Sequence, residues 1–210
     1  MSRPTNIGVG TGEPVHSLEN RMNNAIINIL TQPLEYEWSV QGLGMMRTYL
    51  NETQRLHLWH SSIAIHGATT LHDHAWNFTS EIIFGCMKQA RSVVVDAGSS
   101  ITGTPWMKQR VLCGEGGGVV GEPEELLLGG GPMESYYAGD TYRLEASEIH
   151  NPFPMNNTVT IITREFLEDR DHANVFYPKG GEFGSAEPRP ASRAEILFIT
   201  REVLHSYQES

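Results

Sequence analysis

The chain is poor in cysteine and has no long apolar run. Cys86 and Cys113 are the only cysteines among 210 residues, too few for a disulfide scaffold. No stretch approaches the ~20 consecutive apolar residues of a membrane-spanning helix. The first residues, 1–6, lack the apolar core of a signal peptide. We therefore expect a cytoplasmic protein that has no membrane partner.

Basic residues are also scarce. Lys and Arg number 15 against 25 Asp and Glu, which gives a formal net charge of −10. An acidic surface does not attract nucleic acid, so we expect no nucleic-acid partner. Apolar residues make up 39% of the chain, enough for a folded core. The sequence predicts a flexible, polar arm over residues 1–15 and one domain over residues 16–210.

Helical patterns occur near both ends of the chain. Ser17 has the character of an N-cap, and the apolar spacing after it predicts an amphipathic helix over 18–31. A second, short helix is predicted over 34–41. A third apolar stripe, over 196–207, predicts a helix near the end of the chain.

Between these helices the chain alternates in the manner of short strands separated by glycine turns. The stretch 113–131 contains two glycine clusters and is interpreted as a long hairpin or surface loop. The pattern predicts an all-β fold, a sandwich or a barrel, with the barrel at about residues 45–168. The predicted strands cover 55–65, 81–84, 92–95, 141–144 and 158–166.

The most informative motif is His72-Asp73-His74, together with a distant His150. In an extended strand the side-chain period is two, so His72 and His74 leave the backbone on the same side. Two imidazoles on one side can share a metal ion, and a third from another strand would complete a site of three ligands. The sequence therefore predicts a metal site formed by His72, His74 and His150.

The residues around these histidines resemble the two signatures of the cupin superfamily. Gly67, His-x-His and Gly85 resemble the first signature, although four residues rather than five separate Gly67 from His72. The spacing from Gly139 to His150 follows the second signature. The second signature's Pro, Gly and Asn are replaced here by Glu145, Ser147 and Pro154. The resemblance implies a double-stranded β-helix, or jelly-roll, barrel with N-terminal helices and a C-terminal helix outside it.

The first cupin signature normally contains a glutamate, which this chain lacks. Phe78 or Thr79 occupies its place, and Glu81 could be a ligand only if the strand bulged. A three-histidine site without a carboxylate resembles the thiol dioxygenases, the group of cysteine dioxygenase. That resemblance implies Fe(II) as the cofactor and the addition of O₂ to a thiol sulfur.

Arg47 strengthens the resemblance to cysteine dioxygenases, whereas Arg164 marks a difference from them. Cysteine dioxygenases have a carboxylate-binding arginine about two dozen residues before His-x-His, and Arg47 lies at that distance from His72. Their Ser-His-Tyr relay is lost, because Ile162 and Arg164 occupy the positions of the His and Tyr. The thiol is therefore only one candidate substrate. A second inward arginine, Arg164, would suit a further acidic group.

These residues give three hypotheses for function. The leading one is a mononuclear Fe(II) dioxygenase whose partners are O₂ and a small, carboxylate-bearing substrate. The first alternative is a cupin isomerase or lyase that uses Zn, Mn or Ni as a Lewis acid. The second is a cupin that binds a small molecule without catalysis. The sequence leaves open whether the barrel forms a homodimer.

Several residues near the motif have more ordinary interpretations. Asp73 must point away from its two neighbours, as a solvated residue or as an acceptor for a histidine N–H. Aromatic residues near the motif are expected in the barrel core and pocket wall, and Cys86 is expected to be buried. One of the nearby histidines could reach the pocket as a hydrogen-bond partner. The aromatic residues are Trp59, Trp76 and Phe78, and the histidines are His57, His60 and His66.

Overall fold

The computed structural model describes residues 22–96, 99–113, 118–184 and 188–210. Within these residues the α-helices are α1 (Asn24–Thr31) and α2 (Arg193–Gln208), and a short 3₁₀ helix, η1 (Pro33–Glu35), follows α1. None of the helices in the described residues is long and apolar enough to cross a membrane. The rest of the regular structure consists of strands.

The strands form two antiparallel sheets. The larger sheet has the order β12-β1-β2-β3-β10-β4-β8, and the smaller one has the order β11-β6-β7-β5-β9. The larger sheet consists of β1 (Ser39–Gln41), β2 (Leu43–Tyr49), β3 (Gln54–Ala64), β4 (Trp76–Phe84), β8 (Thr141–Leu144), β10 (Thr158–Phe166) and β12 (Arg189–Pro190). The smaller sheet consists of β5 (Cys86–Val94), β6 (Thr104–Leu112), β7 (Val119–Tyr137), β9 (Ile149–Pro154) and β11 (His172–Pro178).

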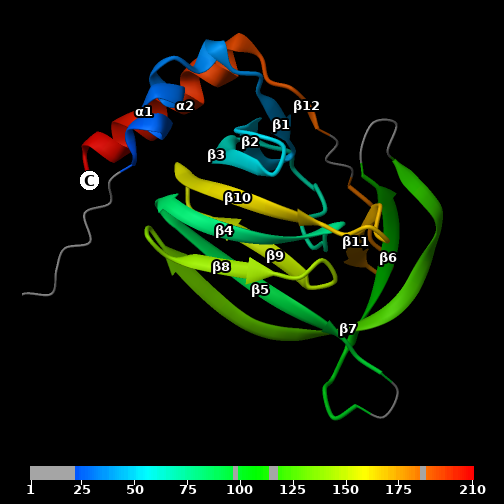
Figure 1. The fold of residues 1–210 in the computed structure, drawn as a ribbon. Coiled ribbons are helices and arrows are strands. Elements are labelled where there is room, and N and C mark those ends of the chain that lie inside the picture. Colours follow the sequence, from blue (N-terminus) through cyan, green and yellow to red (C-terminus); the bar gives the residue numbers. More distant parts are fainter. Residues whose placement is uncertain (1–21, 97–98, 114–117, 185–187) are drawn as a thin grey trace, which may run out of the picture.

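The two sheets curl toward each other into a half-barrel, as Figure 1 shows, and both helices lie together outside the larger sheet. The all-β prediction is confirmed, with a helix near each end of the described chain, and the arrangement is consistent with a jelly roll. Consecutive strands change sheet first from β4 to β5 and then at every step from β7 to β12. These changes bring residues from distant parts of the sequence to the space between the sheets.

The passage from β4 to β5 depends on Gly85. Its φ is +83°, a left-handed conformation that side chains other than glycine rarely adopt. A Cβ at this position would lie 2.7 Å from the Thr158 hydroxyl oxygen and 2.9 Å from the Thr158 Cα. Glycine is therefore required both by the turn and by the close approach of β10.

The side chains of β3 alternate between two environments. Leu56 and Leu58 are fully buried on the outer face, where they pack with Met46, Val159 and the helices. A separate cluster fills the inner face, between the sheets, and Trp59 of β3 belongs to it. The inner cluster consists of Met45, Trp59, Phe78, Ile82, Met87, Tyr142, Leu144 and Ile162. The expected burial of Trp59 and Phe78 in the core is confirmed, and Cys86 is also buried.

The predictions for the helices are correct only in part. The helix over 196–207 is confirmed as α2, which Ser192 and Glu195 begin with a capping box. The first helix begins at Asn24 with Asn23 as its cap, and Ser17 lies outside the described residues. The second helix, over 34–41, is wrong, because Ser39–Gln41 forms β1.

The local reason for this error is visible in the pairing. Val40 of β1 pairs with Met46 of β2 and with Arg189 of β12, so its backbone belongs to a sheet. The indole N–H of Trp38 donates to the Pro33 carbonyl at 2.8 Å, which ends the helical stretch after one turn. Long-range pairing outweighs the weak helical spacing of three residues.

The predicted strands are all present, and some are longer than expected. The predictions 141–144 and 158–166 coincide with β8 and β10. Within the stretch 113–131, residues 119–131 belong to β7, which pairs with β6 and includes the second glycine cluster, Gly129 to Gly131. Residues 114–117 of that stretch lie outside the described residues. The range 45–168 predicted for the barrel is too short, since β11 and β12 follow it in the sequence. Each of these two strands forms the edge of one sheet.

Candidate metal centre

The His-x-His segment lies just before β4, and its backbone is bridged to the two edge strands of the smaller sheet. His72 forms an isolated antiparallel bridge with His150 of β9 and another with Val175 of β11. The His72 N–H donates to the His150 carbonyl at 3.0 Å, and the His150 N–H donates to the His72 carbonyl at 2.9 Å. This reciprocal pair of bonds brings the two signatures together, although His72 and His74 lie outside a regular strand.

The three imidazoles converge. Their rings lie 4.6 to 5.0 Å apart, centroid to centroid. One nitrogen from each ring can be chosen so that all three lie within 4.8 Å of one another, and Nε2 of His74 lies 2.9 Å from Nε2 of His150. Ligands about 2.0–2.1 Å from one metal ion lie about 3 Å apart. The cluster can therefore bind a metal ion.

Hydrogen bonds orient two of the rings for this task. Nδ1 of His72 lies 2.6 Å from the Thr70 carbonyl oxygen, and Nδ1 of His150 lies 2.7 Å from Oε1 of Gln89. Both acceptors require an N–H on Nδ1, which leaves the lone pair on Nε2 free for a metal ion. Gln89 is itself buried, and its amide donates to the Tyr142 hydroxyl at 2.8 Å. Sequence reasoning missed Gln89, which has no recognisable motif.

Burial also keeps the cluster uncharged. Burial lowers the pKa of His72. It holds the pKa of His74 and of His150 well below the usual range, and the neighbouring histidines lower these two pKa values further. The rings are therefore neutral at pH 7. A neutral imidazole is the form that ligates a metal ion.

Asp73 points away from the cluster, as the alternation requires. It is 3% exposed, and it accepts hydrogen bonds from the backbone N–H and the side-chain amide of Asn174. Its carboxylate also forms an ion pair with Arg170 at 2.9 Å. Both expectations for Asp73, a solvated residue or an acceptor for histidine, are wrong. Its role is to fasten the segment to β11.

No carboxylate joins the three histidines among the described residues. Phe78 is buried, and its ring meets the His74 ring edge to face at 4.8 Å. Thr79 faces the other side of β4, and Glu81 is exposed on that side, paired in register with Thr141. Of the two residues that the sequence offered for the glutamate position, Phe78 and Thr79, it is Phe78 whose side chain lies beside the histidines.

Arg47 and Arg164 both lie on the larger sheet, half-buried. Nε of Arg47 donates to the Ser39 hydroxyl at 3.2 Å, and Arg47 pairs in register with His57 of β3. The Arg164 guanidinium donates to the Glu52 carbonyl at 2.6 Å and lies over the Phe166 ring. Burial lowers the pKa of each arginine.

Arg55 is a further inward arginine that the sequence analysis missed. It is 4% exposed and follows the same alternation as His57 and Trp59 on β3. The Trp76 ring lies 5.1 Å from the Arg55 guanidinium carbon and 5.6 Å from the His74 ring, so it links the arginine to the histidines. The period-two pattern of residues 55–59 was the signal that could have identified Arg55.

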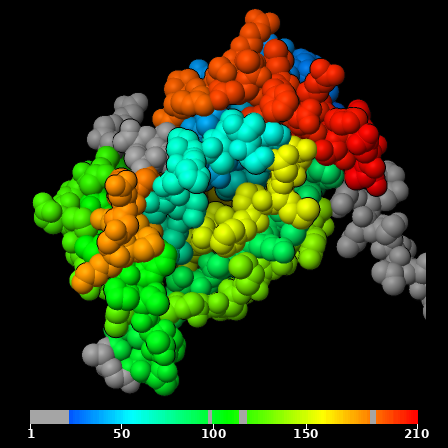
Figure 2. Space-filling model, turned by 180° about the vertical axis from the view of Figure 1, so that it is seen from behind, coloured from blue at the N-terminus to red at the C-terminus, as the bar shows by residue number. Residues whose placement is uncertain are grey.

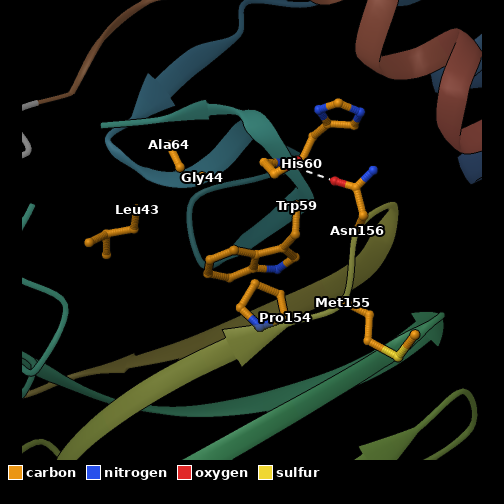
Figure 3. A pocket seen from close by; sticks show the side chains of 9 residues that line it. Leu43, Gly44, Trp59, His60, Ala64, Pro154, Met155 and Asn156 are labelled. Atoms are coloured by element: carbon orange, nitrogen blue, oxygen red, sulfur yellow. Dashed lines mark hydrogen bonds between the residues drawn. The ribbon is translucent and has the colours of Figure 1, made fainter. Parts of the chain in front are cut away.

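The other histidines have different places. His57 is buried among the inner-face residues, whereas His66 is exposed. His60 lies against Phe198 of α2 and also lines a pocket of about 210 Å³. Figure 3 shows that pocket, in which the side chains of Trp59 and Pro154 lie close together and Asn156 accepts a hydrogen bond from the Ser61 N–H at 2.9 Å. In Figure 2 a hollow opens between the cyan and yellow segments, the colours of the residues that line it.

The curled sheets and the three histidines are compatible with a cupin-like metal site. No protein-family model matches the chain, and no curated protein matches it in sequence.

Proposed function

We propose that this protein is a mononuclear Fe(II) dioxygenase of the cupin type that acts on a small, carboxylate-bearing substrate. The observation that carries the proposal is the convergence of the buried His150 with the half-buried His72 and His74, which no carboxylate of the described residues joins. Neutral imidazoles suit iron as well as other transition metals, and three protein ligands leave positions open for substrate and O₂. Bound Fe(II) would supply the electron transfer that overcomes the spin barrier of O₂.

The residues of the chain would hold and shield the reactants. Thr70 and Gln89 fix the tautomers of His72 and His150, so that both present Nε2. Phe78 and Trp76 border His74 with apolar surface that excludes water. Arg47 and Arg164 lie on the wall of the larger sheet, where an arginine fork can bind a carboxylate through two parallel hydrogen bonds.

The first alternative is a cupin isomerase or lyase with Zn, Mn or Ni, which needs a group that moves a proton at the substrate. Trp76 and Phe78, the aromatic neighbours of His74, cannot accept a proton, whereas the buried, neutral His57 on the same inner face can. Metal identity and oxygen uptake therefore decide between the two reactions. A non-catalytic cupin remains the other alternative, and it would bind a ligand without turnover.

Anaerobic purification followed by metal analysis tests the proposal. We expect bound iron in the wild type and a loss of iron to background in His74→Ala, because a ligand is removed. His66→Ala is the matched control, since His66 is exposed, and it should retain iron. Oxygen uptake over a panel of small thiols and carboxylates should follow the bound iron.

Two outcomes would contradict the proposal. Equal metal content in the wild type and His74→Ala would remove the site. Bound Zn, Mn or Ni with no oxygen uptake across the panel would favour the isomerase or lyase.

A further inference from the structure

Three arginines lie in a row across the inner face of the larger sheet. Arg47 is on β2, Arg55 is on the neighbouring β3, and Arg164 is on the next strand, β10. Arg47 is opposite His57, and Arg55 is opposite both Tyr49 and Ile162. Arg164 lies two residues beyond Ile162, so the three positions form a diagonal with Arg55 at its centre.

The row has no carboxylate partner among the described residues, although the exposed phenol of Tyr49 lies beside Arg55 and Arg164. None of the ion pairs found there includes Arg47, Arg55 or Arg164, although the chain carries an excess of acids. Other partly buried or exposed arginines do have such partners, namely Arg91 with Glu134, Arg143 with Glu165, Arg170 with Asp73 and Arg189 with Glu195. Burying a cation without a counter-ion is costly, so an anion that enters the row would relieve that cost.

Several buried polar atoms along the row also lack partners. Nε of Arg55, both ring nitrogens of His57 and the indole nitrogen of Trp76 have no hydrogen bond. His57 is 5% exposed and Arg55 is 4% exposed, so bulk water does not account for them. Unpaired buried donors are rare in folded proteins, so these atoms are available to a ligand or to bound water.

The pKa values of Arg55 and His57 also show that positive charge is concentrated along the row. Burial, followed by the charges of Arg47 and Arg164, lowers the pKa of Arg55 to about 9. Burial and the same three arginines hold the pKa of His57 well below its usual range, which leaves this ring neutral. A neutral imidazole can donate one hydrogen bond to an anion without adding another charge.

We propose that Arg47, Arg55 and Arg164 bind a small organic dianion with two separate acidic groups, such as a dicarboxylate, beside the candidate metal centre. Neighbouring strands are about 4.8 Å apart, so the positive charges are spread along a line rather than gathered at one point. Two separated carboxylates match a line of guanidinium groups better than a single compact anion does. Trp76, in contact with both Arg55 and His74, places the dianion next to the histidines.

The assignment of this dianion as the substrate rests on the proposed function, whereas its binding does not. The test is therefore calorimetric titration of the protein both metal-loaded and after chelation. The probes are malonate, succinate and glutarate, with acetate as the single carboxylate and inorganic phosphate as the compact anion. We expect at least one dicarboxylate to bind more tightly than acetate by about ten- to a hundred-fold, the effect of one additional charge-assisted bond.

Two variants locate the binding. Arg55→Lys keeps the charge and loses the fork, and it should weaken dicarboxylate binding by about ten- to a hundred-fold. Arg164→Gln, at a half-buried position, should bring the dicarboxylate affinity close to that of acetate. Arg110→Gln is the matched control, because Arg110 is exposed on β6 of the other sheet, and it should bind as the wild type does.

The inference is overturned if no dicarboxylate binds more tightly than acetate, or if phosphate binds more tightly than every dicarboxylate. It is also overturned if Arg55→Lys and Arg164→Gln both bind the dicarboxylate as the wild type does. Oxygen uptake separates the two proposals. A dicarboxylate that binds through these arginines but is not oxidised supports the dianion site and counts against the proposed oxygenase.

Discussion

The two faces of the larger sheet are built from the same strands and have opposite character. On β3, Leu56 and Leu58 face outward into an apolar cluster that includes both helices. Arg55 and His57, on the alternate positions, face inward with buried polar atoms that have no partner. The outer face gains stability from apolar burial, and the inner face gives up stability to hold groups that fit a ligand. Substitutions on the two faces should therefore have different consequences.

The largest effect on folding is expected on the outer face. Leu58→Ala removes a fully buried side chain between the sheet and the helices, and it should lower the free energy of unfolding by about 2–5 kcal/mol. Urea denaturation measures this change. The folded fraction should still bind metal, because Leu58 faces away from the histidines. Loss of metal binding in that fraction would show that the two faces are not independent.

The next largest effect is expected on the inner face, at Gln89. Gln89→Ala removes the acceptor that orients His150, and it should weaken metal affinity by about ten- to a hundred-fold. Competition with a chelator of known affinity measures the change. Gln89→Glu is the matched variant, because it retains an acceptor oxygen and should bind metal more tightly than Gln89→Ala does. Equal affinities for the wild type and Gln89→Ala would remove Gln89 from the site.

A smaller effect is expected where α2 begins. The Arg189 hydrogen bond, opposed by burial and assisted by Ser192, holds the pKa of Glu195 at about 2. Because this pKa is depressed on folding, Glu195 contributes stability above its unfolded pKa of about 4.3, and that contribution is lost as the pH falls toward 2. Glu195→Gln should lower the free energy of unfolding at pH 7 by about 0.3–1 kcal/mol.

The pH dependence is the sharper part of this prediction. Denaturation of the wild type and Glu195→Gln between pH 7 and pH 2 should show that the difference between them shrinks as Glu195 becomes protonated. A difference that is constant over this range would assign the effect to packing rather than to charge.

The smallest effect on folding is expected at Arg55, in spite of its burial. Arg55→Met replaces a buried cation that has no counter-ion by an apolar side chain, and it should leave the free energy of unfolding unchanged or raise it. Urea denaturation of Arg55→Met and Leu58→Ala under the same conditions compares their free energies of unfolding. A loss as large as that of Leu58→Ala would mean that Arg55 supports the fold, and the contrast between the two faces would fail.

Much of the fold could be predicted because its signals are local. The alternation in 158–166 and the glycine turns around 141–144 identified β10 and β8, and the apolar stripe over 196–207 identified α2. The short strand β1 could not be predicted, because Val40 is held there by Met46 and Arg189 rather than by its own neighbours. The edge strands β11 and β12 could not be predicted for the same reason.

The candidate site divides in the same way. The spacing of His72, His74 and His150 predicted their convergence, because two family-like signatures place them at fixed offsets from glycines. Gln89 and the ion pair of Asp73 with Arg170 could not be predicted from spacing, since each partner comes from a different strand. A side chain's hydrogen-bond partner across a sheet depends on register, which the sequence does not state.

The sequence by itself determined the class of fold, the polar identity of the buried residues and the three imidazoles, because periodicity and side-chain chemistry are properties of the chain. Only the tertiary structure decided what those residues do together. The pairing of β2, β3 and β10 aligned three arginines across one face, and the bridge between His72 and His150 closed the histidine cluster. The physical reason is that cross-strand neighbours are set by the curl and register of the sheets, and these arise from packing over the whole molecule.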